Sequence, residues 1–219
     1  FGLTGPFSGQ YAADDYRGDA YARFVLDVLD ALKVGSAVIG GNSLGGEVAW
    51  RAVTLEPSRF TGLLLIDASG YALTPGSIPL GFRIARIPLA NRIGEHLLPR
   101  ALVAASVANV YADDSRITEG LVDRYYELTL REGNRRALGL RVQQLEPGAA
   151  ISRLKTIAIP TLVLWGGADQ LIPVDNARRF GSEIEGARVV VLDGLGHVPQ
   201  EEDPVRSLAP VLEFLEAKP

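Results

Sequence analysis

A short apolar segment that runs directly into a glycine-rich turn and then into a helix constrains the fold most strongly. Residues 37–41 (AVIGG) are apolar and rich in glycine, a pattern typical of a buried strand in a parallel sheet. Residues 42–46 (NSLGG) form the turn, and residues 44–55 have helical spacing that ends before Pro57. A strand joined so tightly to a helix predicts an α/β architecture.

The alternation of strand and helix recurs on both sides of a long helical stretch. We expect further strands at residues 62–67, 161–165 and 188–192, and further helices at residues 19–33, 174–184 and 204–215. Residues 1–18 have the composition of a loop. The chain is therefore predicted to form a mostly parallel sheet covered by helices.

Residues 72–150 contain no convincing strand and interrupt that alternation. Their clearest helix is expected at residues 119–131, where Thr118 can cap the first turn. This pattern predicts a helical cap inserted after the second strand. The expected domains are a core made of residues 1–71 and 151–219, and a cap made of residues 72–150.

Ser43 occupies the centre of a G-x-S-x-G pattern in the first strand-to-helix turn. A serine on such a turn is held in a strained conformation with its hydroxyl clear of the sheet. Glycine is expected at Gly41 and Gly45 because side chains there would collide, and Gly46 gives further clearance. The Leu44 N–H, at the start of the helix, can donate to an oxyanion. Ser43 is therefore the candidate nucleophile.

A serine nucleophile needs a base and a group that orients the base. His197 follows the last predicted strand, and Asp169 follows the strand before it. Loops at the carboxyl ends of parallel strands are where such sheets place their sites. The order Ser43, Asp169, His197 is the one expected for a nucleophile-elbow hydrolase.

Three other residues compete for these roles. His96 lies in the helical insertion, where a solvated or packing histidine is the simpler interpretation. Asp67 ends the second strand and could supply the acid from the neighbouring loop, or it could cap the turn that follows. Asp193 is near His197 in sequence, but its position on the shoulder of a strand favours a solvent role.

Composition excludes several classes of function. The formal net charge is −4 and no extended basic run occurs, which argues against a nucleic-acid partner. The chain has no cysteine and only two histidines, so thiolate chemistry is absent and we expect no metal and no cofactor. No apolar run approaches the roughly 18 residues of a membrane span.

Four segments together resemble the α/β-hydrolase superfamily. They are residues 41–46 (GNSLGG), 63–70 (LLLIDASG), 165–173 (WGGADQLIP) and 196–204 (GHVPQEEDP). The resemblance implies an α/β-hydrolase fold and a serine hydrolase that cleaves carboxylic esters. Asn42, directly before the nucleophile, also resembles the enzymes that hydrolyse carbon–carbon bonds of ring-cleavage products. A non-catalytic protein with this fold is the third possibility.

The substrate is expected to be a small, apolar ester. We expect Asn42, Trp165 and Val198 to contact it. The insertion carries apolar side chains at positions that could line a pocket, namely Ile78, Leu80, Phe82, Ile84, Ile87 and Leu89. Arginines of the same segment could instead meet a carboxylate, namely Arg83, Arg86 and Arg92.

The N-terminal residues resemble the middle of the family pattern. Residues 1–5 (FGLTG) are similar to the segment after the family's fourth strand, so the four strands predicted here correspond to its fifth to eighth. We therefore expect a missing N-terminal segment or a second chain to complete the sheet and to supply the other oxyanion amide. Nothing near Phe1 has the pattern of a signal peptide, which makes the cytoplasm the default expectation.

Overall fold

The computed structural model describes residues 6–8, 10–12, 14–72, 83, 87, 94 and 96–217. Within this part of the chain, four parallel strands form one sheet in the order β1-β2-β3-β4. Their bounds are β1 (Ala37–Asn42), β2 (Phe60–Ile66), β3 (Thr161–Gly166) and β4 (Arg188–Leu192). Each lies within two residues of the predicted strand, so the expected parallel sheet is confirmed.

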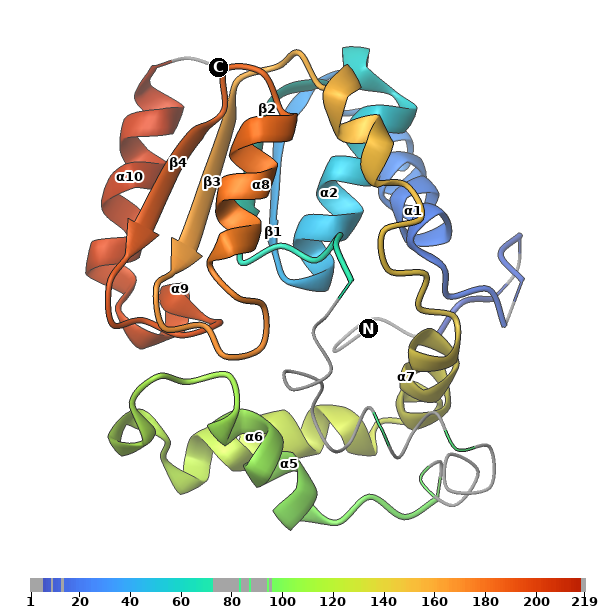
Figure 1. The fold of residues 1–219 in the computed structure, drawn as a ribbon. Coiled ribbons are helices and arrows are strands. Elements are labelled where there is room, and N and C mark those ends of the chain that lie inside the picture. The colour runs from blue at the N-terminus through green and yellow to red at the C-terminus, as the bar shows by residue number, and fades with distance from the viewer. Residues whose placement is uncertain are drawn as a thin grey trace.

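Helices connect and flank these strands (Figure 1). The core helices are α1 (Gly18–Ala31), α2 (Leu44–Leu55), α8 (Asp175–Glu183), α9 (Pro199–Glu202) and α10 (Pro204–Glu216). Three short 3-10 turns are η1 (Pro57–Arg59), η3 (Asp114–Arg116) and η4 (Ile151–Thr156). None of the helices in the described ranges is both long enough and apolar enough to span a bilayer.

The two faces of the sheet are covered by different helices because successive side chains of a strand point to opposite faces. Leu63, Leu65 and Val163 face the main core, which α1, α2 and α8 complete. Leu164 faces the opposite side, where it packs with Leu192 and with Val211 of α10. β3 is buried along its whole length and lies between β2 and β4.

The expectation that residues 37–41 are buried on both faces is wrong for the described structure. β1 lies at the edge of the described sheet, and Val38 on its outer face is 38% exposed. The reason is that α10 packs over β3 and β4, at the other side of the sheet (Figure 1). Ile39, which points to the opposite face, does pack against the main core.

The described part of residues 72–150 contains helices and no strand, as the sequence predicts. These helices are α5 (Arg100–Ala108), α6 (Glu119–Leu130) and α7 (Asn134–Gln143), and they lie beyond the carboxyl ends of the strands (Figure 1). The Thr118 hydroxyl accepts a hydrogen bond from the Leu121 N–H at 3.1 Å, which confirms the predicted helix cap. That this segment acts as a lid remains a prediction.

Most of the insertion residues expected to face a substrate lie outside the described residues. They are Ile78, Leu80, Phe82, Ile84, Leu89, Arg86 and Arg92. Ile87 and Arg83 are described, and both are exposed.

Candidate active site

The candidate catalytic residues follow the carboxyl ends of the four strands. Ser43 comes directly after β1, Asp67 after β2, Asp169 after β3 and His197 after β4. Because the strands are parallel and in register, these ends meet at one edge of the sheet. The sheet thus brings together residues that are up to 154 positions apart in sequence.

Ser43 has the strained backbone that the turn predicts. Its φ of 54° and ψ of −118° are rare for a residue with a side chain. The Ser43 N–H donates to the Ile66 carbonyl at 2.9 Å, and the Ser43 carbonyl accepts from the amides of Glu47 at 3.1 Å and Ser69 at 2.9 Å. These bonds fix Ser43 between β1 and α2. The adjacent Leu44 N–H lies in the first turn of α2, where helix amides have no intrahelical acceptor.

The crowding around this turn differs partly from the prediction. A Cβ added at Gly41 would lie 2.3 Å from the carbonyl carbon of Gly45, so a side chain there is excluded as expected. A Cβ at Gly45 would meet nothing within 4 Å, so the expected collision at this position is wrong. The second crowded position is Gly46, whose added Cβ would lie 2.5 Å from the Cβ of Ala68. The reason is that Gly46, not Gly45, is the residue of α2 that faces the loop after β2.

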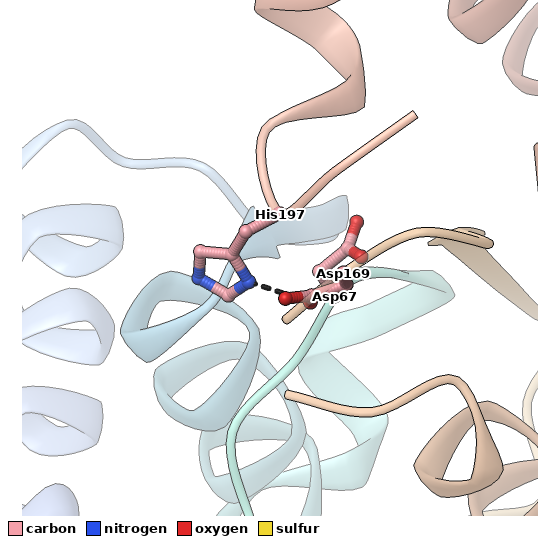
Figure 2. Close-up of side chains that lie close together, drawn as sticks. All are labelled: Asp67, Asp169 and His197. Carbon is pink, nitrogen blue, oxygen red and sulfur yellow. Dashed lines mark hydrogen bonds and ion pairs between the residues drawn. The ribbon is translucent and has the colours of Figure 1, made fainter. Parts of the chain in front are cut away.

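His197 and Asp169 form a buried pair. Nδ1 of His197 lies 2.7 Å from Oδ2 of Asp169, and both residues are buried (Figure 2). The other oxygen of Asp169 accepts hydrogen bonds from the amides of Leu171 at 2.8 Å and Ile172 at 2.9 Å. The carboxylate is therefore held from both sides, an arrangement suited to orienting an imidazole whose Nε2 acts as a base.

Asn42 joins the nucleophile turn to the histidine loop. Its Nδ2 donates to the carbonyl of His197 at 2.8 Å and to the carbonyl of Ile66 at 3.2 Å. The residue directly before Ser43 is thus hydrogen-bonded to the residue that would be its base. We expected Asn42 to contact the substrate; the structure shows its amide group in this bridge.

Trp165 and Val198, which we expect to contact the substrate, are both buried. Trp165 is completely buried, and its indole N–H donates to the Ile172 carbonyl at 3.0 Å. Val198 is buried against Val103 and Tyr111 of the insertion. Neither residue is among those that line the cavity beside Ser43, and their contact with a substrate stays a prediction.

Asp67 lies beside the same pair (Figure 2). It is completely buried, its Oδ1 accepts from the Gly166 N–H at 2.9 Å, and its Oδ2 has no partner among the described residues. One carboxylate oxygen of Asp67, one of Asp169 and a ring nitrogen of His197 lie within 4.8 Å of one another. Burial and the negative charge of Asp169 raise the pKa of Asp67 well above its usual range. This spacing would also suit a metal ion, but Asp169 and His197 already hydrogen-bond each other.

The other two competing residues do not join the group of Asp67, Asp169 and His197. His96 is exposed in a turn, where its carbonyl accepts from Arg135. Asp193 is exposed at the end of β4. Both positions agree with the solvent roles that the sequence favours.

A cavity of about 330 Å³ opens beside Ser43. Its walls come from the nucleophile turn, the loop after β2, α7 with the loop that follows it, and the loop after β3. The lining residues are Ser43, Leu44, Glu47, Ser69, Gly70, Tyr71, Ala72, Leu138, Arg141, Val142, Leu145, Glu146, Pro147, Leu171 and Ile172. The lining is mostly apolar, and the insertion supplies one wall of it.

A buried ion pair crosses this cavity wall between the core and the insertion. Nη2 of Arg141, on α7, lies 2.6 Å from Oε2 of Glu47, on α2. The other oxygen of Glu47 accepts from Nε of Arg51 at 2.9 Å, and Nη1 of Arg141 donates to the Tyr16 carbonyl at 3.2 Å. Sequence reasoning missed this pair, because an arginine within a polar helix gives no sign that it is buried.

The insertion also supports the histidine loop directly. The His197 N–H donates to the Val110 carbonyl at 2.8 Å. The buried carboxylate of Glu202 accepts from the amides of Gly196 at 2.7 Å and Ala112 at 3.0 Å. Glu202 thus ties the residue before His197 to the loop between α5 and α6. Sequence reasoning missed Glu202, although its place in an acidic pair directly before Asp-Pro, five residues after His197, was a usable signal.

The fold and the order Ser43, Asp169, His197 define a hydrolase-type α/β protein with a nucleophile elbow. The chain belongs to the alpha/beta hydrolase family, whose family model matches residues 2–211.

Three curated relatives share this similarity. An uncharacterized hydrolase, YugF, of Bacillus subtilis is 27% identical over 183 residues, covering 84% of this chain and 66% of the relative. Lipase 3 of Moraxella sp. is 29% identical, covering 86% of this chain and 59% of the relative. A 2-hydroxy-6-oxononadienedioate/2-hydroxy-6-oxononatrienedioate hydrolase of Burkholderia vietnamiensis is 30% identical, covering 91% of this chain and 69% of the relative. The chain therefore spans about two thirds of the length of these relatives.

Two solved structures show the same fold. A variant of the meta-cleavage product hydrolase of Pseudomonas fluorescens IP01 has a TM-score of 0.77 at 22% identity, covering 97% of this chain and 75% of that one. A thermophilic esterase of Thermogutta terrifontis has a TM-score of 0.73 at 22% identity, covering 91% and 72%. At this identity the likeness concerns the fold alone.

Proposed function

We propose that this chain is the catalytic part of a serine hydrolase that cleaves carboxylic esters through an acyl-enzyme on Ser43. The observation that carries the proposal is the strained backbone of Ser43 next to the loop of His197. Asn42 joins the two segments by a hydrogen bond to the His197 carbonyl, and the His197 ring is hydrogen-bonded to Asp169. In this mechanism His197 removes the proton of the Ser43 hydroxyl as it attacks the ester carbonyl.

The remaining steps use the same groups. The Leu44 N–H, at the positive end of α2, stabilises the oxyanion of the tetrahedral intermediate. His197 then gives its proton to the departing alcohol, which leaves the acyl group on Ser43. Water, deprotonated by His197, releases the acid and restores the hydroxyl. Asp169 stabilises the imidazolium that forms in each half of the cycle.

The charges around the cavity favour a neutral ester as substrate. Among the described residues that line the cavity, the charged ones are Glu47, Glu146 and one cation, Arg141. Arg141 is already paired with Glu47 and with the Tyr16 carbonyl. A substrate carboxylate would therefore have to displace an existing ion pair, whereas the apolar lining suits an uncharged acyl or alcohol group.

Hydrolysis of a carbon–carbon bond is the second candidate. Two observations favour it: the Burkholderia relative is named for a dienedioate, which is a dicarboxylate, and Arg141 lies in the cavity wall. In that case Arg141 would have to exchange Glu47 for the substrate.

A substrate panel separates the two candidates. Short and long p-nitrophenyl esters and a ring-cleavage dienone should be assayed with the wild type, Ser43→Ala and Asp169→Asn. We expect ester turnover that Ser43→Ala abolishes, and that Asp169→Asn lowers steeply in kcat with little change in KM. Turnover of the dienone alone would establish the second candidate. No turnover of any substrate and no fluorophosphonate labelling would favour a non-catalytic binding protein.

A further inference from the structure

Asp67 carries two features that the fold does not require. It is one of three described non-glycine residues with a positive φ, here 42°, a conformation that is unfavourable for a residue with a side chain. Its carboxyl group is fully buried, and its Oδ2 lacks a partner among the described residues. A buried polar atom without a partner is destabilising, so its presence next to His197 calls for a functional explanation.

We propose that Asp67 is a positioning residue that holds a proton on Oδ2 and donates it in a hydrogen bond to Asp169. This inference rests on the proposed function, because Asp169 matters only if it orients a catalytic His197. The bond would supply the missing partner of Oδ2 and give the Asp169 carboxylate a further donor.

Hydrogen bonding explains why the proton belongs to Asp67 and not to Asp169. Asp169 accepts from the amides of Leu171 and Ile172 and from Nδ1 of His197, and each of these donors stabilises the ionised form. Asp67 accepts from one amide among the described residues, that of Gly166. Two carboxylates so close together cannot both stay ionised away from water, and the one with fewer donors takes the proton.

The other charges around Asp67 act in the same direction. Asp169 and, more weakly, Glu202 act on it with negative charge, and both favour its neutral form. His197 faces the pair from the loop after β4, and in the proposed mechanism it is positive only while it holds the proton of the Ser43 hydroxyl or of the attacking water. A neutral Asp67 adds a donor without adding a second negative charge next to the imidazole.

Two substitutions separate this role from a structural one. Asp67→Asn keeps a donor and an acceptor, and asparagine tolerates a positive φ. Asp67→Gly removes the side chain and also suits a positive φ, so it should fold without backbone strain. We expect kcat of Asp67→Asn to stay within a few-fold of wild type. Asp67→Gly should lose about tenfold or more in kcat with KM unchanged.

The pH dependence of kcat/KM tests the charge of Asp67. If Asp67 is neutral, Asp67→Asn changes no charge and the acidic limb, set by His197, stays in place. An ionised Asp67 would stabilise the imidazolium, and its removal would move that limb to lower pH by about one unit or more. Such a shift would overturn the proposal. Equal kcat values for Asp67→Gly and the wild type would also overturn it, as would a loss of kcat in Asp67→Asn as large as that in Asp67→Gly.

A measurement that needs no activity keeps this inference separate from the proposed function. The infrared spectrum of the folded protein at about pH 8 should contain a C=O stretch from one protonated carboxylic acid. Asp67→Asn should remove that band, and Asp193→Asn, a matched change at an exposed aspartate, should leave it. Absence of the band from the wild type would overturn the proposal even if ester turnover were observed.

Discussion

Glu202 connects the loop of His197 to the insertion by hydrogen bonds, and the structure allows the effect of its loss on stability to be estimated. Its two oxygens accept from the amides of Gly196 and Ala112, and its carbonyl accepts from Arg116. Glu202→Gln keeps the shape of the side chain but replaces one acceptor oxygen with an NH₂ group. One of the two buried amides then faces a donor and loses its partner.

The expected loss of stability is about 2–4 kcal/mol. A hydrogen bond to a charged group contributes roughly 1.5–3 kcal/mol, and a buried amide left without a partner adds about 1–3 kcal/mol that partly overlaps with it. For a chain of this size, such a loss lowers Tm by roughly 4–16 °C. Since Gly196 directly precedes His197, kcat should fall as well, while KM changes little.

Urea unfolding and steady-state kinetics on the same preparation test both parts. Glu201→Gln is the matched control, because Glu201 is less buried and its described hydrogen bonds come from the hydroxyls of Tyr111 and Tyr125, not from backbone amides. It should cost less than about 1 kcal/mol. If Glu202→Gln unfolds at the same urea concentration as Glu201→Gln and turns over normally, the carboxylate does not position the histidine loop.

Three further predictions address the turn, the buried acid and the insertion. Gly41→Ala should destabilise by about 1–3 kcal/mol or prevent folding, whereas Gly45→Ala should have little effect in thermal unfolding; the reverse order would contradict the packing described. The pKa of Asp67 is raised in the folded state, so at neutral pH the folded state binds more protons at this residue than the unfolded state does. The free energy of unfolding therefore falls as the pH rises from about 4. Asp67→Asn should therefore gain more stability over the wild type at about pH 8 than at about pH 5 in denaturant titrations, and an equal difference at both would refute the raised pKa. Leu138→Ala, in the cavity wall, should shift the preferred acyl length, whereas deleting the loop around Val110 should lower kcat for every ester, because that loop supports His197.

The sequence predicts the sheet well because its signals are local. The apolar run after Gly62, the tight turn at Ser43 and the positions of Asp169 and His197 after their strands each depend on a few neighbouring residues. Parallel pairing then brings these strand ends to one edge, and the structure places Asp169 and His197 in contact.

The features that were missed depend on contacts between distant segments. Glu47 and Arg141 are 94 residues apart, and neither segment alone indicates that the fold brings their side chains into a buried ion pair. Trp165 is adjacent to the active-site loop in sequence but faces the core, because a strand alternates its side chains. Gly45 was chosen by symmetry about Ser43, whereas the approach of Ala68 falls on Gly46.

Labelling with a fluorophosphonate, followed by mass spectrometry of the peptides, tests the central claim most directly. The reagent forms a covalent bond only with a serine that an adjacent base activates. The account predicts one label on the peptide that contains Ser43, none in Ser43→Ala, much slower labelling in His197→Ala and an unchanged rate in His96→Ala. Labelling of another residue, or of Ser43 at the wild-type rate in His197→Ala, would contradict it.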